Sequence, residues 1–241
     1  MELMRRRGMM AIPSGGGSYD WTDYVQNGLE IIWDGIQNTR NGHASAPSAW
    51  ENLAGSSFDM ANTNVTFEDD CAVFTGANYF KTAYTAKSYM TAEIVVSHET
   101  IASGYGVCAK TNTSRVDDSG IGLIIYQKNT NQYQFFTGHG FNQYRYKPVA
   151  ADAVGIKGSY SAVADTNYNC DLYKNGVLTS ENYASEDWGY GNYAIGAYDR
   201  NTPPNAYFFK GRIYCIRLYT RALTEAEVLH NYAVDQVRFN L

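Results

Sequence analysis

Residues 171–179 read Asp171-Leu-Tyr-Lys-Asn-Gly-Val-Leu-Thr179. Asn175 and Gly176 readily adopt positive φ angles at the two central positions of a type I′ turn, whose twist matches that of two antiparallel strands. The residues on either side of this pair alternate in the manner of half-buried strands. The segment therefore predicts a β-hairpin with a two-residue turn.

Strand-like segments of this kind recur along the chain beyond residue 18. Short apolar or alternating runs, separated by Gly, Asn, Asp and Ser, predict strands at 28–33, 71–74, 90–98, 105–110, 121–128, 133–136, 157–164, 168–174, 194–197 and 208–219. Aromatic residues make up 15% of the 241 residues, and this composition favours strands over helices. The short spacing favours an antiparallel sandwich over a parallel α/β sheet. Because such sandwiches often use this length as one unit, we expect one domain at 19–241.

One helix is predicted near the C-terminus. The hydroxyl of Thr224 can accept from the amide of Glu227 while the Glu227 carboxylate reaches back to Thr224, and Leu223 can pack against Val228; together these form a capping box and a hydrophobic staple. Four residues then share one helical face: Val228, Leu229, Tyr232 and Ala233. We expect this short helix to pack on the sandwich.

Three segments together carry a family resemblance. The first segment is Gly28-Leu-Glu-Ile-Ile-Trp-Asp34, followed by Asn41-Gly-His43 and Trp50-Glu-Asn-Leu-Ala-Gly55. The second segment is the hairpin at 171–178. The third segment, residues 209–228, contains a strand, the sequence Arg-Ala-Leu and the capping box. They resemble laminin G-like jelly-roll domains of the concanavalin A-like lectin/glucanase superfamily. The resemblance implies an all-β fold, an antiparallel jelly-roll β-sandwich with one short C-terminal helix. It says less about activity, because this fold serves lectins, glycosidases and structural modules.

The chemistry of the enzymatic branch is not visible in the sequence. Its retaining glucanases would imply a strand with the pattern Glu-x-Asp-x-x-Glu, which is absent here. Phe67-Glu-Asp-Asp70 and Ser185-Glu-Asp-Trp188 favour surface positions, and Glu225 and Glu227 favour helix capping. We therefore predict no catalytic residues. An enzyme remains the alternative, since carboxylates from distant segments could still meet in space.

Metal, cofactor and redox signals are equally weak. The histidines, His43, His98, His139 and His230, lack metal-ligand spacing, so we expect ordinary polar or surface positions and no cofactor. Asp117-Asp118-Ser-Gly120 could offer oxygen ligands to calcium, but it lacks the ordered EF-hand loop and favours a solvated turn. The four cysteines, Cys71, Cys108, Cys170 and Cys215, form no C-x-x-C pair, and three sit in strand-like runs. These favour buried reduced thiols.

A sugar ligand would suit three segments of the sequence. Two are aromatic and glycine-rich, at 137–146 and 188–193, and the third is 198–201. Aromatic rings can cover the apolar C–H faces of a sugar, while amide, carboxylate and guanidinium groups bond its hydroxyls. The alternative is that these aromatics fill the sandwich or cover its edge. The predicted glycan-binding residues are His139, Tyr144, Tyr146, Trp188, Tyr190, Asp199 and Arg200.

Residues 1–18 are predicted to form a basic arm with Arg5, Arg6 and Arg7 and a Gly/Ser linker at 14–18. The arm lacks the apolar run of a signal peptide, and no run elsewhere approaches a membrane span. A net charge of −5 argues against a general nucleic-acid partner.

Arm, linker and lectin-like domain together resemble small accessory virion proteins of bacteriophages. This resemblance implies capsid decoration or attachment, multicopy display, assembly in the host cytoplasm, anchoring of the arm to virion proteins and weak binding of host-surface glycans. A carbohydrate-active enzyme and a purely structural module are the alternatives.

Overall fold

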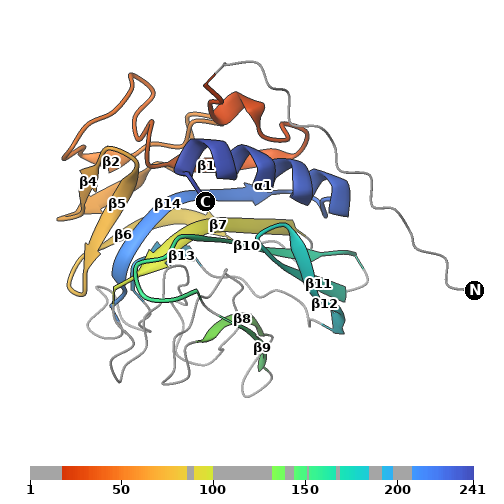
Figure 1. Ribbon diagram of the computed structural model, residues 1–241. Helices are drawn as coiled ribbons and strands as arrows, with labels where there is room; N and C mark the ends of the chain where they lie inside the picture. Colours follow the sequence, from red (N-terminus) through yellow and green to blue (C-terminus); the bar gives the residue numbers. More distant parts are fainter. Residues whose placement is uncertain are drawn as a thin grey trace, which may run out of the picture.

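Two β-sheets and one helix form three layers in the computed structural model (Figure 1). The structure describes residues 18–85, 90–99, 132–138, 144–150, 152–166, 169–184, 192–197 and 208–241. The large sheet has the order β12-β11-β10-β7-β14-β5-β4, with β1 also paired to β14, and the small sheet has the order β13-β6-β3-β2. Every pairing within them is antiparallel. The expected all-β sandwich with a single C-terminal helix is confirmed.

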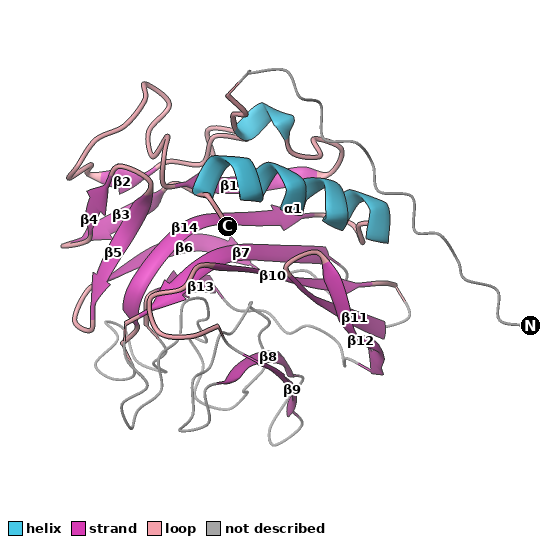
Figure 2. Cartoon of the chain, viewed as in Figure 1, coloured by secondary structure: helices cyan, strands magenta, loops and turns pink. Residues whose placement is uncertain are grey.

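The elements have these bounds: a 3-10 helix η1 (Trp21–Asp23), β1 (Leu29–Asp34), β2 (Ala49–Trp50), β3 (Met60–Thr63), β4 (Thr66–Glu68), β5 (Cys71–Thr75), β6 (Tyr79–Thr85), β7 (Met90–His98), β8 (Gln132–Gly138), β9 (Tyr144–Ala150), β10 (Gly158–Ala164), β11 (Asn169–Lys174), β12 (Val177–Ala184), β13 (Asn192–Ile195), β14 (Lys210–Tyr219) and the helix α1 (Glu225–Phe239). Strands β8 and β9 form a separate antiparallel pair (Figure 2).

Most predicted strands that fall on described residues are found within one or two residues of their expected ends. The predictions at 105–110 and 121–128 lie outside the described residues. The strands β2, β3, β4, β6 and β9 were not predicted. Segments such as Met60-Ala-Asn-Thr63 are too short and too polar to stand out by alternation, and they pair only because a longer neighbour supplies the ladder.

Strand β7 shows how the layers arise from alternation. Ala92, Ile94 and Val96 point into the core between the sheets, together with Trp50 and Phe80 of the small sheet. The intervening residue Val95 belongs to a second cluster on the other face of the large sheet. That second face is buried but polar, because Thr91, Glu93 and Ser97 share it with Val95.

A β-bulge in β14 adjusts this alternation. The register with β7 shifts between Ile213 and Cys215, so that Tyr214 and Cys215 both pack in the cluster beneath α1. The bulge places one extra residue on the helix side of the strand. Beyond it, Arg217 stands opposite Glu93 of β7.

Arg217 is buried among carboxylates on that side. Its Nη1 and Nη2 donate to the carboxylate of Asp235 on α1 at 2.6 and 2.8 Å, and its Nε donates to Glu93 at 2.8 Å. All three side chains are at most 1% exposed. Desolvation opposes the charge of Arg217, but Asp235 and Glu93 outweigh it and hold its pKa well above the ordinary value. Burial raises the pKa of Glu93.

A second ion pair joins this network. Arg238 of α1 donates to Asp34 of β1 at 2.6 and 3.1 Å. The hydroxyl of Tyr24 donates to Asp235 at 2.8 Å and accepts from Arg238 at 3.2 Å, linking the two pairs. Charge-assisted bonds of this kind are roughly twice as strong as neutral ones. They fix α1 and the segment around Tyr24 on the large sheet.

The start of α1 follows the prediction, but its buried face does not. The Thr224 and Glu227 capping box is present, and Leu223 and Val228 are both buried. Of the four residues expected to share one face, only Val228 is fully buried, and Leu229 is 46% exposed. The helix buries Val234 and Phe239 with Val228. It also buries two polar residues, Asn231 and Asp235, because the sheet beneath offers Glu93 and Arg217 as partners.

The hairpin around Asn175 and Gly176 is confirmed, with φ angles of 50° and 70° at the turn. We expect Gly176→Val to lower the free energy of unfolding by roughly 1–3 kcal/mol, since a β-branched residue resists positive φ. A Cβ atom there would also lie 2.8 Å from Cδ1 of Tyr232. Denaturant unfolding measures the loss. The control Val177→Thr changes the exposed neighbour and should stay within about 0.5 kcal/mol; equal losses would show that the turn geometry is not the cause.

Candidate functional site

The predicted binding residues lie mostly where the structure gives no description. His139, Trp188, Tyr190, Asp199 and Arg200 are outside the described residues, as are Arg5, Arg6 and Arg7 of the arm. Tyr144 and Tyr146 are described through the backbone of β9, where they stand opposite Gly138 and Phe136 of β8. Their role in glycan binding stays a prediction.

The outer face of the small sheet carries a described aromatic cluster. Strand β6 turns Phe80 into the core and Tyr79 and Lys81 to the other side, where Tyr79 is 8% exposed and Lys81 is half-buried. The Tyr79 ring lies 6.2 Å from the ring of Phe208, and Nζ of Lys81 lies 5.4 Å from the Tyr79 ring centroid. We call these three residues, Tyr79, Lys81 and Phe208, the β6 aromatic cluster.

The neighbours of this cluster are small. The register of β3 and β6 places Ala61 opposite Lys81 and Thr63 opposite Tyr79, and Ala61 and Ala83 are exposed. Lysine donates hydrogen bonds, and aromatic rings contact apolar C–H faces. This cluster was not predicted from the sequence, because its members come together only through sheet register and through Phe208, far along the chain.

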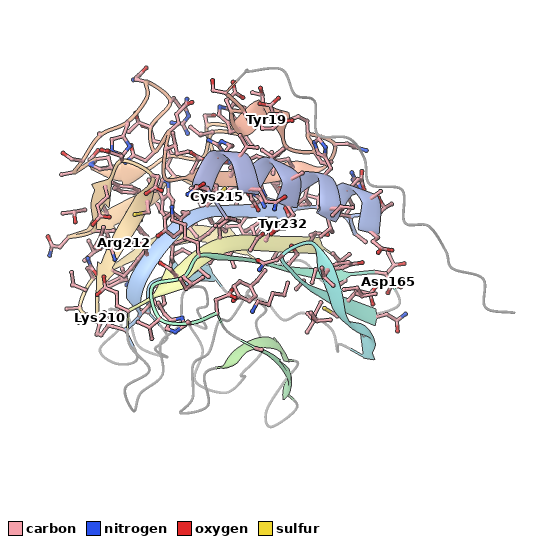
Figure 3. All side chains as sticks on the ribbon, viewed as in Figure 1. Tyr19, Asp165, Lys210, Arg212, Cys215 and Tyr232 are labelled. Carbon is pink, nitrogen blue, oxygen red and sulfur yellow. The ribbon has the colours of Figure 1, made fainter. Side chains whose placement is uncertain are left out.

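The carboxylates noted in the sequence are engaged by cations. Arg212, labelled in Figure 3, binds Glu68 at 2.9 Å and Glu99 at 2.6 Å. Lys157 binds Asp70 at 2.9 Å. The hydrogen bond from Arg212 lowers the pKa of Glu68. A general acid for glycoside cleavage needs the opposite shift, a raised pKa. The surface interpretation of Glu68 and Asp70 is confirmed.

Glu227 is likewise held by hydrogen bonds within the fold. Arg221 donates to both of its carboxylate oxygens, at 2.6 and 2.9 Å, and Thr224 donates from its backbone and its hydroxyl. The hydrogen bond from Arg221 is the chief cause that lowers its pKa to about 2. The capping interpretation of Glu227 is therefore confirmed.

Histidines and cysteines of the described part show no site either. In the described ranges, no group of three or more His, Cys, Asp or Glu residues could hold a metal ion. Of the two positions expected for the histidines, polar or surface, His98 does not take the surface one: it is buried, and burial lowers its pKa. Cys71, Cys170 and Cys215 are buried free thiols, as predicted, and burial raises the pKa of Cys170 to about 12. Cys108 and the Asp117–Asp118 turn lie outside the described residues.

No helix in the part of the chain that the structure describes is long and apolar enough to cross a membrane.

Comparisons with known proteins support the fold. No protein-family model matches the sequence, and a search of curated protein sequences gives no significant match. Among solved structures, the Trypanosoma rangeli sialidase is similar with a TM-score of 0.62 and 14% identity, covering 87% of this chain and 33% of the sialidase. The binding domain of botulinum neurotoxin serotype D gives a TM-score of 0.63 and 9% identity, covering 87% of this chain and 52% of that one.

This chain thus spans about a third of the sialidase and half of the toxin domain. At such identities the likeness establishes a shared β-sandwich architecture and no activity.

Proposed function

We propose that the chain is a non-catalytic carbohydrate-binding module. The β6 aromatic cluster carries this proposal, because the half-buried Phe208 ring and the Lys81 ammonium group lie together at the outer side of a sheet. The buried Tyr79 ring supports them, and the small exposed residues Ala61 and Ala83 lie beside them. The partly exposed Phe208 ring can cover the apolar face of a sugar while Lys81 donates to a hydroxyl or a carboxylate. The aromatic loops predicted from the sequence would extend the same chemistry.

The structural neighbours add support of a different kind. One neighbour is a sialidase that has been solved with sialic acid, and the other is named as the binding domain of a toxin. A sandwich of this shape is therefore compatible with sugar recognition, and the half-buried Lys81 adds a cation that an acidic sugar could contact. The engagement of Glu68, Asp70 and Glu227 by cations favours binding over hydrolysis.

The test is a glycan array probed with a multimerised form of the full chain, because avidity converts weak single contacts into a measurable signal. We expect binding to a subset of glycans and no release of sugar from them. Lys81→Ala should reduce the signal several-fold, whereas Lys210→Ala, an exposed lysine of β14, should leave it unchanged. A blank array would overturn the proposal, and sugar release would replace it with the enzymatic alternative.

We further propose that the module is displayed in many copies on a virus-like particle through the arm at 1–18, as the phage resemblance implies. Three arginines on a Gly/Ser linker can reach an acidic surface without constraining the folded domain. Deleting residues 1–18 should leave the sandwich folded but prevent its incorporation into the parent particle. Normal incorporation of the truncated chain would refute the anchoring role.

A further inference from the structure

The ionic network between α1 and the large sheet holds more carboxylates than cations. Within the described residues it contains two guanidinium groups, those of Arg217 and Arg238, and three carboxylates: Asp34, Glu93 and Asp235. All five side chains are at most 2% exposed. With every group ionised, the network would carry a net charge of −1 in a buried site. Burial of an unmatched charge costs far more free energy than burial of a matched pair.

The hydrogen bonds single out Glu93 as the carboxylate without a guanidinium of its own. Asp235 accepts from both Nη1 and Nη2 of Arg217, at 2.6 and 2.8 Å. Asp34 accepts from both terminal nitrogens of Arg238, at 2.6 and 3.1 Å. Glu93 accepts only from the remaining Nε of Arg217, at 2.8 Å. Because each of the two bidentate pairs is neutral, the unmatched negative charge falls on Glu93.

The two carboxylate oxygens of Glu93 have different neighbours. Its Oε2 accepts from Nε of Arg217 and from Nδ2 of Asn231, both at 2.8 Å. Its Oε1 lies 3.1 Å from the hydroxyl of Ser161 on β10. Guanidinium and amide N–H groups only donate, whereas a hydroxyl can donate or accept. A proton therefore fits on Oε1, where it can be donated to Oγ of Ser161, and does not fit on Oε2.

The register of the large sheet places these groups directly beneath α1. Ser161 of β10 stands opposite Glu93 of β7, and Arg217 of β14 stands opposite Glu93 on the other side. Helix α1 lies over this sheet (Figure 1), and Asn231 and Asp235, four residues apart on one helical face, contact the row from above. The charge of Glu93 therefore acts on two residues of α1.

We propose that the folded chain holds one proton on Oε1 of Glu93, taken from solvent as α1 docks, and that the network is thereby a pH-sensitive clasp for α1. The protonated carboxyl donates to Oγ of Ser161, and the network is neutral. Loss of the proton puts a negative charge beside the carboxylate of Asp235, and both carboxylates then compete for Arg217. The clasp weakens as the pH rises. This device does not depend on glycan binding.

The groups that face Glu93 agree with this assignment. Burial is the chief cause that raises its pKa, while the charge of Arg217 lowers the pKa and that of Asp235 raises it. A raised folded-state pKa gives stability that is complete below the ordinary value of 4.5 and is lost as the pH rises through the folded-state pKa. The other titratable groups packed against the network have pKa values that burial raises, so they stay neutral over this range: Tyr24, Tyr219 and Cys215.

Infrared spectroscopy of the full chain tests for the proton directly. At about pH 6.5 exposed carboxyl groups are ionised, so a protonated carboxyl gives a separate C=O stretching band. We expect this band in the parent protein, shifted by isotopic labelling of glutamate carboxyl carbons but not of aspartate carboxyl carbons. A parent protein without the band would overturn the proposal, and this measurement needs no variant.

Glu93→Gln assigns the band to its residue. Glutamine keeps a carbonyl for Arg217 and an N–H donor for Ser161 but cannot ionise. The band should be absent in this variant and retained in Glu68→Gln, the matched control at a carboxylate that Arg212 binds on the surface. A band that survives in Glu93→Gln would place the proton elsewhere and overturn the proposal.

Denaturant unfolding between about pH 5 and pH 7 tests the coupling of the proton to folding. A proton held in the folded state and released on unfolding lowers the folding equilibrium constant about tenfold for each pH unit. We expect the constant of the parent protein to fall in this way relative to that of Glu93→Gln, up to the folded-state pKa. Glu68→Gln should keep the pH dependence of the parent, since the pKa of Glu68 is lowered. Equal pH dependence in the parent and in Glu93→Gln would contradict proton uptake.

Amide hydrogen exchange separates a clasp on α1 from a general loss of stability. We expect the protection of α1 amides, corrected for the intrinsic pH dependence of exchange, to fall as the pH rises, while the amides of β6 keep theirs. The fall should be absent in Glu93→Gln. Equal losses in α1 and β6, or no loss in α1, would show that the proton does not control the docking of this helix.

Discussion

Replacing Arg217 by methionine is expected to lower the free energy of unfolding by roughly 3–5 kcal/mol. The change removes one partner from a buried ionic network and leaves the Asp235 carboxylate in a fully buried site without its bidentate guanidinium. The Tyr24 ring, 4.0 Å from the guanidinium carbon, loses a contact as well. Guanidinium chloride unfolding, followed by tryptophan fluorescence, measures the loss.

Glu93→Gln is the matched control in the same network. Arg217 keeps Asp235, and a glutamine carbonyl can still accept from its Nε, so the expected loss is below about 1 kcal/mol. Burial raises the folded-state pKa of Glu93 above its ordinary value of 4.5. The stability linked to the protonated form is therefore complete below pH 4.5 and is lost as the pH rises through the folded-state pKa.

Glu93→Gln has no carboxyl group at this position and does not lose stability through its ionisation. Its stability relative to the parent protein should accordingly improve as the pH rises above 4.5. A variant that is as unstable as Arg217→Met at pH 7 would instead make Glu93 an indispensable counter-ion.

This network also marks the limit of what the sequence predicts. The hairpin at Asn175 and Gly176 and the helix start at Thr224 are set by residues within a few positions, so both were predicted correctly. Arg217 and Glu93, by contrast, are 124 residues apart and become partners only when β7 and β14 pair. Read alone, each resembles a solvent-facing charge in a strand.

The candidate site also combines residues that local sequence predicts with residues that only the fold brings together. Local enrichment in aromatics and glycine selected residues that lie outside the described parts or, at Tyr144 and Tyr146, are described only as backbone. The β6 aromatic cluster has no such enrichment. Tyr79 and Phe208 are separated by more than half the chain, and the Ala61 and Thr63 neighbours follow from β-sheet register. Composition could indicate the kind of ligand, but not this surface.

Gly196→Ala is expected to be as damaging as the loss of Arg217, at roughly 2–5 kcal/mol. Gly196 follows β13 of the small sheet at a φ of 87°, and a Cβ atom there would overlap the ring of Phe74 on the large sheet. The ring has little room to move, because it packs against Phe80 and Phe209 at centroid distances of 6.1 and 5.7 Å. Left-handed backbone costs about 1–2 kcal/mol for a residue with a Cβ, and overpacking adds about 1–3 kcal/mol.

A matched glycine separates the two contributions. Gly155 has a similar φ of 79°, but a Cβ atom there meets no other atom within 4 Å, so Gly155→Ala should cost only the backbone strain of about 1–2 kcal/mol. Combining Gly196→Ala with Phe74→Leu should then recover about 1–2 kcal/mol relative to the sum of the single losses, because the smaller side chain makes room for the methyl group. Strict additivity in that double-mutant cycle would mean that Gly196 is required for its φ angle alone, and that the close approach of Phe74 does not limit how the two sheets pack.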